Sequence, residues 1–232
     1  MIVDSLVFPC RDLVERLDAA GIDRAVLCPP RARGETYAQL NDRVAVAARA
    51  LPDRLVAFCR VDPLVPGAVG EARRALGQLG CRGLFLHPWE DAFRVTDRAV
   101  DPLCALGAPV IVATGYPWVA EALQVAELAR RHPGTTFVAT NGGQLNISGL
   151  GQTDAELAVA STPNLHLQTA GVYREDFLEG IVARHGAERL LFASACPVFD
   201  PRLELLRVMW APAFTDADQA AILAGNAERL LG

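Results

Sequence analysis

The stretch LGCRGLFLHP, residues 79–88, contains the structural unit that the chain repeats. An amphipathic helical pattern over residues 68–79 stops at Gly80, and glycine readily takes the left-handed conformation that closes a helix. Residues 83–87 then form an almost unbroken apolar run. Such a run, without alternating polar residues, is typical of a strand buried on both faces of a parallel sheet. The stretch therefore predicts a helix that leads into a buried parallel strand.

The same unit recurs along the whole chain. Apolar runs rich in Val, Leu, Ile and Phe occupy residues 3–8, 24–28, 55–60, 83–87, 109–113, 136–140, 165–169 and 190–193. Amphipathic helical patterns lie between several of them, at residues 37–51, 68–79, 118–131 and 175–185. Eight strands that alternate with helices, without linkers, predict an α/β fold with one (β/α)8 TIM-barrel domain over residues 1–232. An open doubly wound sheet is the alternative, although the chain lacks the Gly-rich turn expected after its first strand.

The composition narrows the classes of partner. The 232 residues carry a net charge of −5 and the arginines are scattered, so binding to nucleic acid is not expected. No stretch approaches the roughly 20 apolar residues of a membrane span, and the first residues lack the pattern of a secretory signal. The six cysteines form no C-x-x-C pair, which favours reduced thiols. These features predict a cytoplasmic protein without a membrane partner.

Several segments are similar to those of a known family in their order and spacing. They are IVDS (2–5), GIDRAVL (21–27), LGCRGLFLHP (79–88), GAPVIVATG (107–115), HPGTTFVATNGG (132–143) and GAERLLFASACP (186–197). Together they resemble the amidohydrolase-related proteins, a TIM-barrel family that includes metal-dependent hydrolases and non-oxidative decarboxylases. The resemblance implies a barrel whose functional site lies at the carboxyl ends of the strands.

The chain departs from this family at the positions where the resemblance would place metal ligands and an acid/base group. The first strand of such proteins resembles D-x-H-x-H, and here Leu6 and Phe8 take the two histidine positions. Ala113 and Thr140 replace the histidines that end the fifth and sixth strands. Ala195 replaces the aspartate of a Gly-Ser-Asp-x-Pro pattern in the eighth. The resemblance, with these departures, predicts a barrel without bound metal and without another cofactor.

The histidine count also argues against a metal site. A catalytic zinc site needs about three His or carboxylate ligands, and the chain has four histidines in all. His132 and His185 lie at the ends of helical patterns and are expected on the surface, and His166 lies inside the seventh predicted strand. Only His87 stands at the end of a strand. Asp4, retained from the first-strand pattern, is expected to have a structural role as a buried hydrogen-bond acceptor.

His87 is the first candidate for chemistry. A histidine at the carboxyl end of a barrel strand can act as a general base, and Arg60, at the end of the third predicted strand, is the second candidate catalytic residue. A histidine that only satisfies its own hydrogen bonds is the alternative, and a thiol nucleophile with His87 as its base is less favoured. The residues predicted to bind a substrate are Arg31, Thr114, Asn141 and Cys196. Arg31 and Arg33 with Arg60 allow a mouth that attracts an anion, although solvated loop arginines are the commoner explanation.

Two functional hypotheses from different classes follow. The favoured one is a degenerate, non-catalytic barrel without a metal. It would be a structural or regulatory partner of a metal-bearing paralogue, in a homo- or hetero-oligomer of amidohydrolase-like barrels. The alternative is a repurposed metal-free hydrolase or lyase that acts on a small acid or amide, with His87 in the pocket. An active metal-dependent amidohydrolase is the least favoured. A mouth plugged by Leu6 and Phe8 would count against the alternative, because no substrate could enter.

Overall fold

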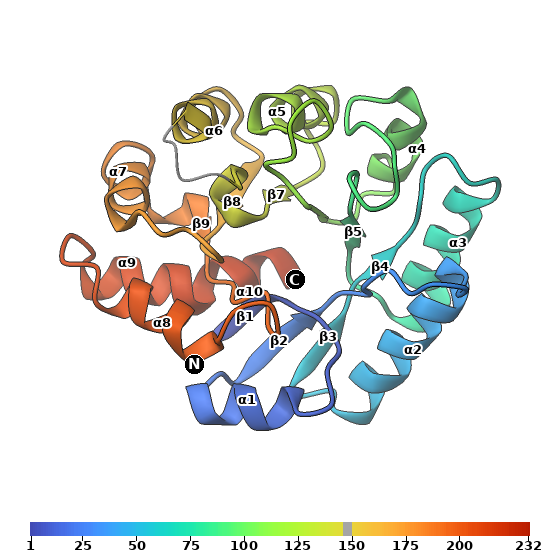
Figure 1. The fold of residues 1–232 in the computed structure, drawn as a ribbon, viewed down its shortest axis with the longest axis horizontal. Coiled ribbons are helices and arrows are strands. Elements are labelled where there is room, and N and C mark those ends of the chain that lie inside the picture. The colour runs from blue at the N-terminus through green and yellow to red at the C-terminus, as the bar shows by residue number, and fades with distance from the viewer. Residues whose placement is uncertain (146–149) are drawn as a thin grey trace.

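Short parallel strands form a ring at the centre of the molecule, and helices surround it (Figure 1). The computed structural model describes residues 1–145 and 150–232. Its strand segments are β1 (Val3–Val7), β2 (Arg24–Leu27), β3 (Leu55–Ala57), β4 (Cys59–Arg60), β5 (Leu84–Leu86), β6 (Val110–Val112), β7 (Phe137–Ala139), β8 (Leu165–Gln168) and β9 (Leu190–Leu191). Neighbouring segments pair in parallel, in the orders β1-β2-β3 and β4-β5-β6-β7-β8-β9.

Backbone hydrogen bonds join these two groups of strands into a barrel. Only Phe58 separates β3 from β4, so the two segments continue one another along the chain. At the other junction, the N–H of Ser5 donates to the carbonyl oxygen of Phe192 at 2.9 Å, and Val7 forms a parallel bridge with Cys196. β1 therefore lies beside the end of β9. The prediction of an α/β fold of the (β/α)8 barrel type is confirmed.

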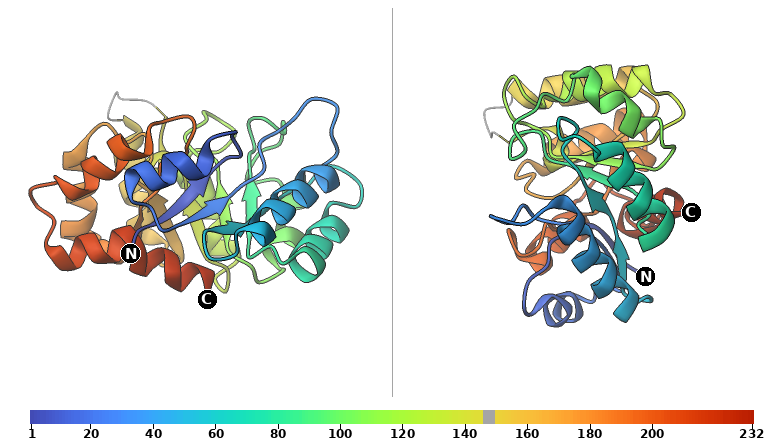
Figure 2. Two further views of the ribbon diagram at one scale, coloured as in Figure 1. Left: turned by 90° about the horizontal axis from the view of Figure 1, so that it is seen from below. Right: turned by 90° about the vertical axis from the view of Figure 1, so that its right-hand side faces the viewer.

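The helices lie outside the ring of strands (Figure 2). They are α1 (Leu13–Ala20), α2 (Tyr37–Ala50), α3 (Ala68–Arg74), α4 (Asp101–Cys104), α5 (Ala122–Arg131), α6 (Leu150–Ser161), α7 (Glu175–His185), α8 (Pro201–Met209), α9 (Asp216–Ala220) and α10 (Asn226–Leu231). Two π-helical segments, Ala75–Leu79 and Ala221–Gly225, follow α3 and α9. None of the helices in the described ranges has the length and apolar character that a membrane crossing requires.

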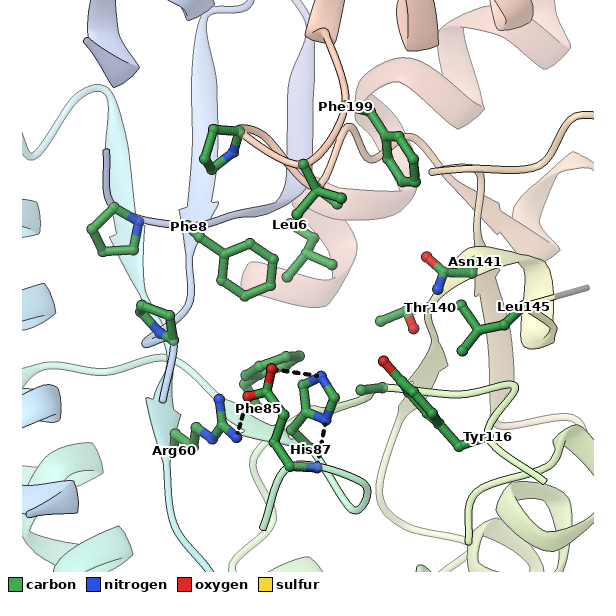
Figure 3. Close-up of a pocket in the computed structure, with 17 residues that line it drawn as sticks. Leu6, Phe8, Arg60, Phe85, His87, Tyr116, Thr140, Asn141, Leu145 and Phe199 are labelled. Atoms are coloured by element: carbon green, nitrogen blue, oxygen red, sulfur yellow. Dashed lines mark hydrogen bonds and ion pairs between the residues drawn. The ribbon is translucent and has the colours of Figure 1, made fainter. Parts of the chain in front are cut away.

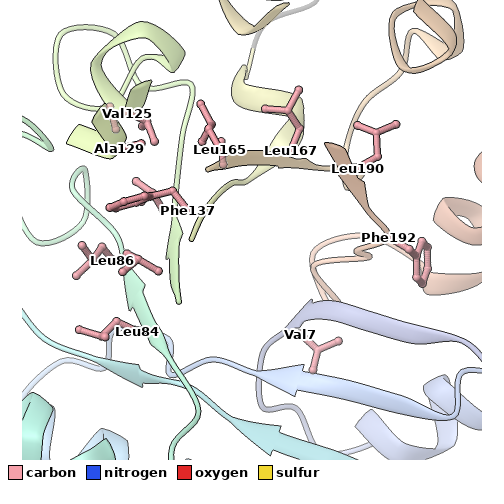
Figure 4. Packing of buried hydrophobic residues seen from close by; sticks show 14 of the residues in the cluster. Val7, Leu84, Leu86, Val125, Ala129, Phe137, Leu165, Leu167, Leu190 and Phe192 are labelled. Atoms are coloured by element: carbon pink, nitrogen blue, oxygen red, sulfur yellow. The ribbon is translucent and has the colours of Figure 1, made fainter. Parts of the chain in front are cut away.

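Buried apolar side chains form two layers, because successive strand residues point to opposite faces. The outer layer packs between strands and helices, where Phe137 of β7 lies in one cluster with Val125 and Ala129 of α5 (Figure 4). The inner layer fills the ring and includes Leu6 and Phe85. Full burial of one large apolar side chain stabilises the fold by about 1.5–3 kcal/mol, so the two layers together hold the strands in place.

The helix predicted over residues 118–131 begins only at Ala122. Trp118 has a left-handed φ of 67°, which an α-helix does not contain, and Tyr116 forms an isolated antiparallel bridge with Ala120. The segment after β6 is therefore a tight turn. This turn carries Tyr116 to the carboxyl end of the barrel.

The strand predicted over residues 55–60 is interrupted at Phe58. Asn41, on the buried side of α2, donates to the carbonyl oxygen of Arg60 at 3.0 Å and accepts from its N–H at 2.8 Å. The Asn41 side chain thus satisfies the backbone N–H and C=O of Arg60. The contact holds the end of β4, and with it the Arg60 side chain, at the barrel mouth.

The two histidines expected on the surface are mostly buried. The His132 side chain is only 16% exposed and its Nε2 lies 2.8 Å from Asp101. The His185 side chain is 19% exposed and its Nε2 lies 3.6 Å from Glu156. The expectation was wrong because a carboxylate from a neighbouring helix covers each ring, which the position of a helix end does not reveal.

Candidate functional site

A pocket of about 440 Å³ opens at the carboxyl ends of the strands. Its labelled side chains point toward a common space from several strands (Figure 3). Apolar and aromatic groups form most of its wall, and the polar side chains in it are Arg60, His87, Glu90, Tyr116, Thr140 and Asn141. This volume lies within the range of roughly 300–1,000 Å³ that is usual for small-molecule sites.

The positions where the resemblance would place ligands all meet in this pocket. Leu6 and Phe8 reach it from β1, and Ala113, Thr140 and Ala195 reach it from the ends of β6, β7 and β9. Leu6 and Phe8 line the pocket without closing it, since a cavity remains between them and the opposite wall. Leu6 and Phe8 therefore do not plug the barrel mouth.

The side chains in the pocket do not fit a catalytic metal ion. Such an ion needs about three His, Cys or carboxylate donors at one place, and the five positions just named offer a single hydroxyl, that of Thr140. Across residues 1–145 and 150–232, no three His, Cys, Asp or Glu side chains are arranged to hold a metal ion. His87 and Glu90 are the imidazole and the carboxylate of the pocket wall, and they make only two donors.

Arg60 is held by two carboxylates from the loop after β5. Its Nε donates to Asp91 at 2.9 Å and its Nη2 donates to Asp91 at 3.0 Å and to Glu90 at 2.8 Å. The side chains of Arg60 and Asp91 have no exposed surface. The guanidinium also lies 5.7 Å from the centre of the Phe85 ring. Arg60 is thus a fixed part of the pocket wall whose charge is already compensated.

His87 lies between the aromatic wall and Glu90. Its Nδ1 accepts from the backbone N–H of Glu90 at 3.3 Å, and its Nε2 lies 3.6 Å from the Glu90 carboxylate. The rings of Phe85 and Tyr116 lie 5.8 and 5.4 Å from the imidazole, centre to centre. Burial lowers the pKa of His87 below its ordinary value of 6.5, which the nearby carboxylate offsets only in part. The imidazole is therefore neutral near pH 7.

Asp4 lies inside the ring, below the pocket, and fastens β1 to the end of β9. Its Oδ1 accepts from the backbone N–H of Leu6 at 3.1 Å and of Ser194 at 3.0 Å, and its Oδ2 bonds the Ser194 hydroxyl at 2.5 Å. Burial raises the pKa of Asp4 to about 7, although these hydrogen bonds act in the opposite direction. The contacts fit a structural role, because the carboxyl group has no access to the pocket.

The remaining predicted site residues are only partly brought together. Asn141 lines the pocket with the predicted catalytic pair, His87 and Arg60. Thr114 does not, because Ala113 takes the inward position and the next residue of a strand points the other way. The Thr114 hydroxyl is fully buried and donates to the carbonyl oxygen of Val112 at 2.7 Å.

Cys196 and Arg31 also lie outside the pocket, which corrects their prediction as substrate-binding residues. Cys196 follows the inward-facing Ala195 and packs in the outer apolar layer, where burial raises the pKa of its thiol to about 12. Arg31 is half exposed and donates to Asp91 at 2.8 Å. The anion-attracting mouth is not formed, because Arg31 and Arg60 share that carboxylate.

Two polar residues of the pocket were not predicted, Glu90 and Tyr116. Glu90 follows His87 closely in the segment HPWED, and two acids directly after a strand end were a signal that Arg60 of the neighbouring strand would be paired. Tyr116 stood outside any recognised pattern because the turn that positions it was taken for the first residues of a helix. Its ring stacks on that of Trp89, 5.6 Å away and 6° from parallel.

Comparison with known proteins agrees with this architecture. A family model described as amidohydrolase matches residues 3–232. The chain belongs to the amidohydrolase family. No match was found among curated proteins.

Three solved structures have a fold similar to that of this amidohydrolase-family barrel. An uncharacterised TIM-barrel protein from Bordetella bronchiseptica aligns with a TM-score of 0.84 at 21% identity, over 99% of this chain and 98% of its own. A 2,6-dihydroxybenzoate decarboxylase from Rhizobium aligns with a TM-score of 0.75 at 17% identity, over 99% and 98%. A 5-carboxyvanillate decarboxylase from Novosphingobium aromaticivorans, with bound manganese, aligns with a TM-score of 0.76 at 16% identity, over 96% and 80%. At these identities the likeness concerns the fold.

Proposed function

We propose that this member of the amidohydrolase family works without a metal ion and binds a small, flat, mainly apolar organic molecule at the barrel mouth. One observation carries the proposal. The positions that would hold ligands in a metal-dependent relative converge on an open pocket, and their side chains are Leu6, Phe8, Ala113, Thr140 and Ala195. Aliphatic and aromatic side chains favour contact with an apolar ring over coordination of a cation.

The aromatic residues support the shape of the proposed ligand. Phe8, Phe85 and Tyr116 line the pocket, and Phe8 meets Phe85 edge to face with ring centres 5.7 Å apart. The ring of Trp89 stacks on that of Tyr116. Rings held by such contacts present a preformed apolar surface, which lowers the entropy lost on binding. A planar molecule matches this surface better than a branched one.

Binding of aromatic fragments tests the proposal. A set of flat aromatic fragments, screened by ligand-observed NMR against the whole chain, should contain binders. Ala113→Leu should abolish their binding, because the added methyl groups enter the pocket. Leu157→Ala is the matched control, since Leu157 is 54% exposed on α6 and far from the pocket wall. Fragments that bind the Ala113→Leu protein unchanged, with its fold intact, would contradict the proposal.

A second candidate is a non-catalytic subunit that associates with another amidohydrolase-like barrel. Large apolar side chains are exposed on loops after four strands, all at the end of the barrel where the pocket opens. They are Trp89, Trp118, Tyr173 and Val198, which are 54% to 74% exposed. Apolar groups gathered at one end of a barrel favour contact with a partner. Light scattering of the purified chain, alone and mixed with a metal-bearing family member, tests this candidate, and a monomer in both samples would contradict it.

A further inference from the structure

Both ring nitrogens of His87 face Glu90, and Nδ1 is hydrogen-bonded to it. Nδ1 accepts the hydrogen bond of the Glu90 backbone N–H at 3.3 Å, and in a neutral imidazole the accepting nitrogen carries no proton. The proton is therefore on Nε2, which faces the Glu90 carboxylate at 3.6 Å. Figure 3 shows both contacts as dashed lines at the His87 ring. In this arrangement His87 has no lone pair to offer a ligand and cannot serve as the pocket's base.

Among the described residues of the pocket wall, Glu90 carries a charged acceptor with free hydrogen-bonding capacity, beside the uncharged Tyr116 hydroxyl and Asn141 amide. One of its oxygens, Oε2, accepts from Arg60 at 2.8 Å. The other, Oε1, lies 3.6 Å from His87, which is longer than a hydrogen bond. An ionised carboxylate has about four acceptor sites, so Oε1 keeps free capacity. The Glu90 side chain is 42% exposed and lines the pocket, so a ligand can reach this oxygen.

The charges around the pocket are balanced without a ligand. Arg60 binds Asp91 and Glu90, and Arg31 binds Asp91 as well. Two cations therefore face two carboxylates, and the imidazole beside them is neutral. Neither guanidinium is left as an uncompensated positive charge for an anionic ligand. An entering carboxylate would instead meet the negative charge of Glu90 at close range, which disfavours it.

We infer that Glu90 sets the specificity of the pocket, and that the ligand is an uncharged aromatic molecule with an N–H or O–H donor, such as a phenol or an aromatic amide. The inference rests on the proposed function and narrows it. The ring of the ligand packs against Phe85 and Tyr116, and its donor binds Oε1 of Glu90. His87 is a positioning residue, because its Nδ1 accepts from the Glu90 backbone N–H and so holds the residue that carries the carboxylate. Of the small acid or amide that the sequence suggested, the inference retains the amide and excludes aromatic carboxylates.

A matched set of probes tests this inference. Phenol, benzamide and benzoate are titrated against the whole chain by ligand-observed NMR at pH 7.5. Phenol and benzamide should bind at least about tenfold more tightly than benzoate, which is the effect of about 1.4 kcal/mol, a typical value for a hydrogen bond to a charged group. Glu90→Gln replaces the acceptor charge by an amide of the same shape. This change should weaken phenol and benzamide by about tenfold and bring benzoate to within about threefold of them.

Two control variants keep the outcomes separate. Glu228→Gln changes an exposed glutamate on α10 and should leave all three affinities unchanged. Glu90→Asp keeps the charge, and it should preserve the exclusion of benzoate even where the affinity for phenol falls. Benzoate that binds wild type as tightly as phenol, or an unchanged ratio in Glu90→Gln, would overturn the inference while leaving an apolar binding site in place. Failure of every probe and every screened fragment would overturn the proposed function as well.

Discussion

Arg60 and Asp91 form a two-point ion pair that has no contact with solvent. The Nε and Nη2 atoms of Arg60 donate to the two carboxylate oxygens of Asp91 at 2.9 and 3.0 Å, and neither side chain has exposed surface. Arg60 ends β4, whereas Asp91 lies in the loop after β5. The pair therefore connects two neighbouring strands at the mouth of the barrel. It also places Glu90, the residue before Asp91 in the chain, at the pocket wall.

Arg60→Met should destabilise the protein strongly. The change leaves the buried Asp91 carboxylate without its cation, and loss of one partner of a buried pair costs about 3–5 kcal/mol. The measurement is the free energy of unfolding from urea titration. Arg184→Met is the control, because Arg184 and its partner Glu156 are partly exposed and such a pair contributes at most about 1 kcal/mol. Equal losses in the two variants would contradict the view that the pair holds the mouth together.

Asp4 should make the stability of the protein fall as pH rises from about 4 to about 7. Its ordinary pKa is 3.8, and burial raises the pKa to about 7 in the folded protein. A folded-state pKa above the unfolded one means that the stabilising effect is complete below pH 3.8 and is lost as pH rises through 7. The loss amounts to at most about 4 kcal/mol.

Asp4→Asn isolates this contribution. The asparagine keeps the shape and cannot ionise, so the difference in unfolding free energy between variant and wild type should shift in favour of the variant by up to about 4 kcal/mol between pH 4 and pH 8. Urea titrations at several pH values measure it. A difference that is constant with pH would show that Asp4 does not titrate in this range.

His87 should be a neutral imidazole with its proton on Nε2. Long-range proton–nitrogen NMR spectra of labelled protein at pH 7 identify the tautomer, because Nδ1 accepts from Glu90 and must be unprotonated. Titration should place the His87 pKa below 6.5, since burial disfavours the charged ring. The pKa of the same ring in urea-unfolded protein is the internal control and should be about 6.5. A ring protonated on Nδ1 at pH 7 would contradict the arrangement.

The purified chain should contain no stoichiometric manganese or zinc. Elemental analysis measures the content, and thermal unfolding with added MnCl₂ or EDTA measures the effect. An ion bound at a hundredfold excess over its dissociation constant would add about 2.7 kcal/mol of stability and raise the melting temperature by several degrees. No such rise is expected, because the pocket lacks three donors. One equivalent of tightly held metal would contradict both this expectation and the proposed function.

The candidate site was predictable only where a side chain follows directly from its place in a strand. His87 follows β5 directly and Asn141 lies two residues after β7, and both line the pocket. Thr114 and Cys196 each follow a pocket residue, Ala113 and Ala195 respectively, by one position. Both point outward, because a shift of one residue in a strand reverses the side chain. Glu90 was missed because a loop, whose path no periodicity predicts, carries it to Arg60.

The sequence by itself determined the barrel and the residues that stand at the family's ligand positions, since hydrophobic periodicity is a local property and a replaced histidine is visible without a fold. Only the tertiary structure decided that Leu6, Phe8, Ala113, Thr140 and Ala195 surround one open pocket, and that the arginines near it are neutralised. These relationships join strands far apart in the chain. Whether a charge is free or paired, and a cavity open or filled, depends on distances that exist only after the ring of strands has closed.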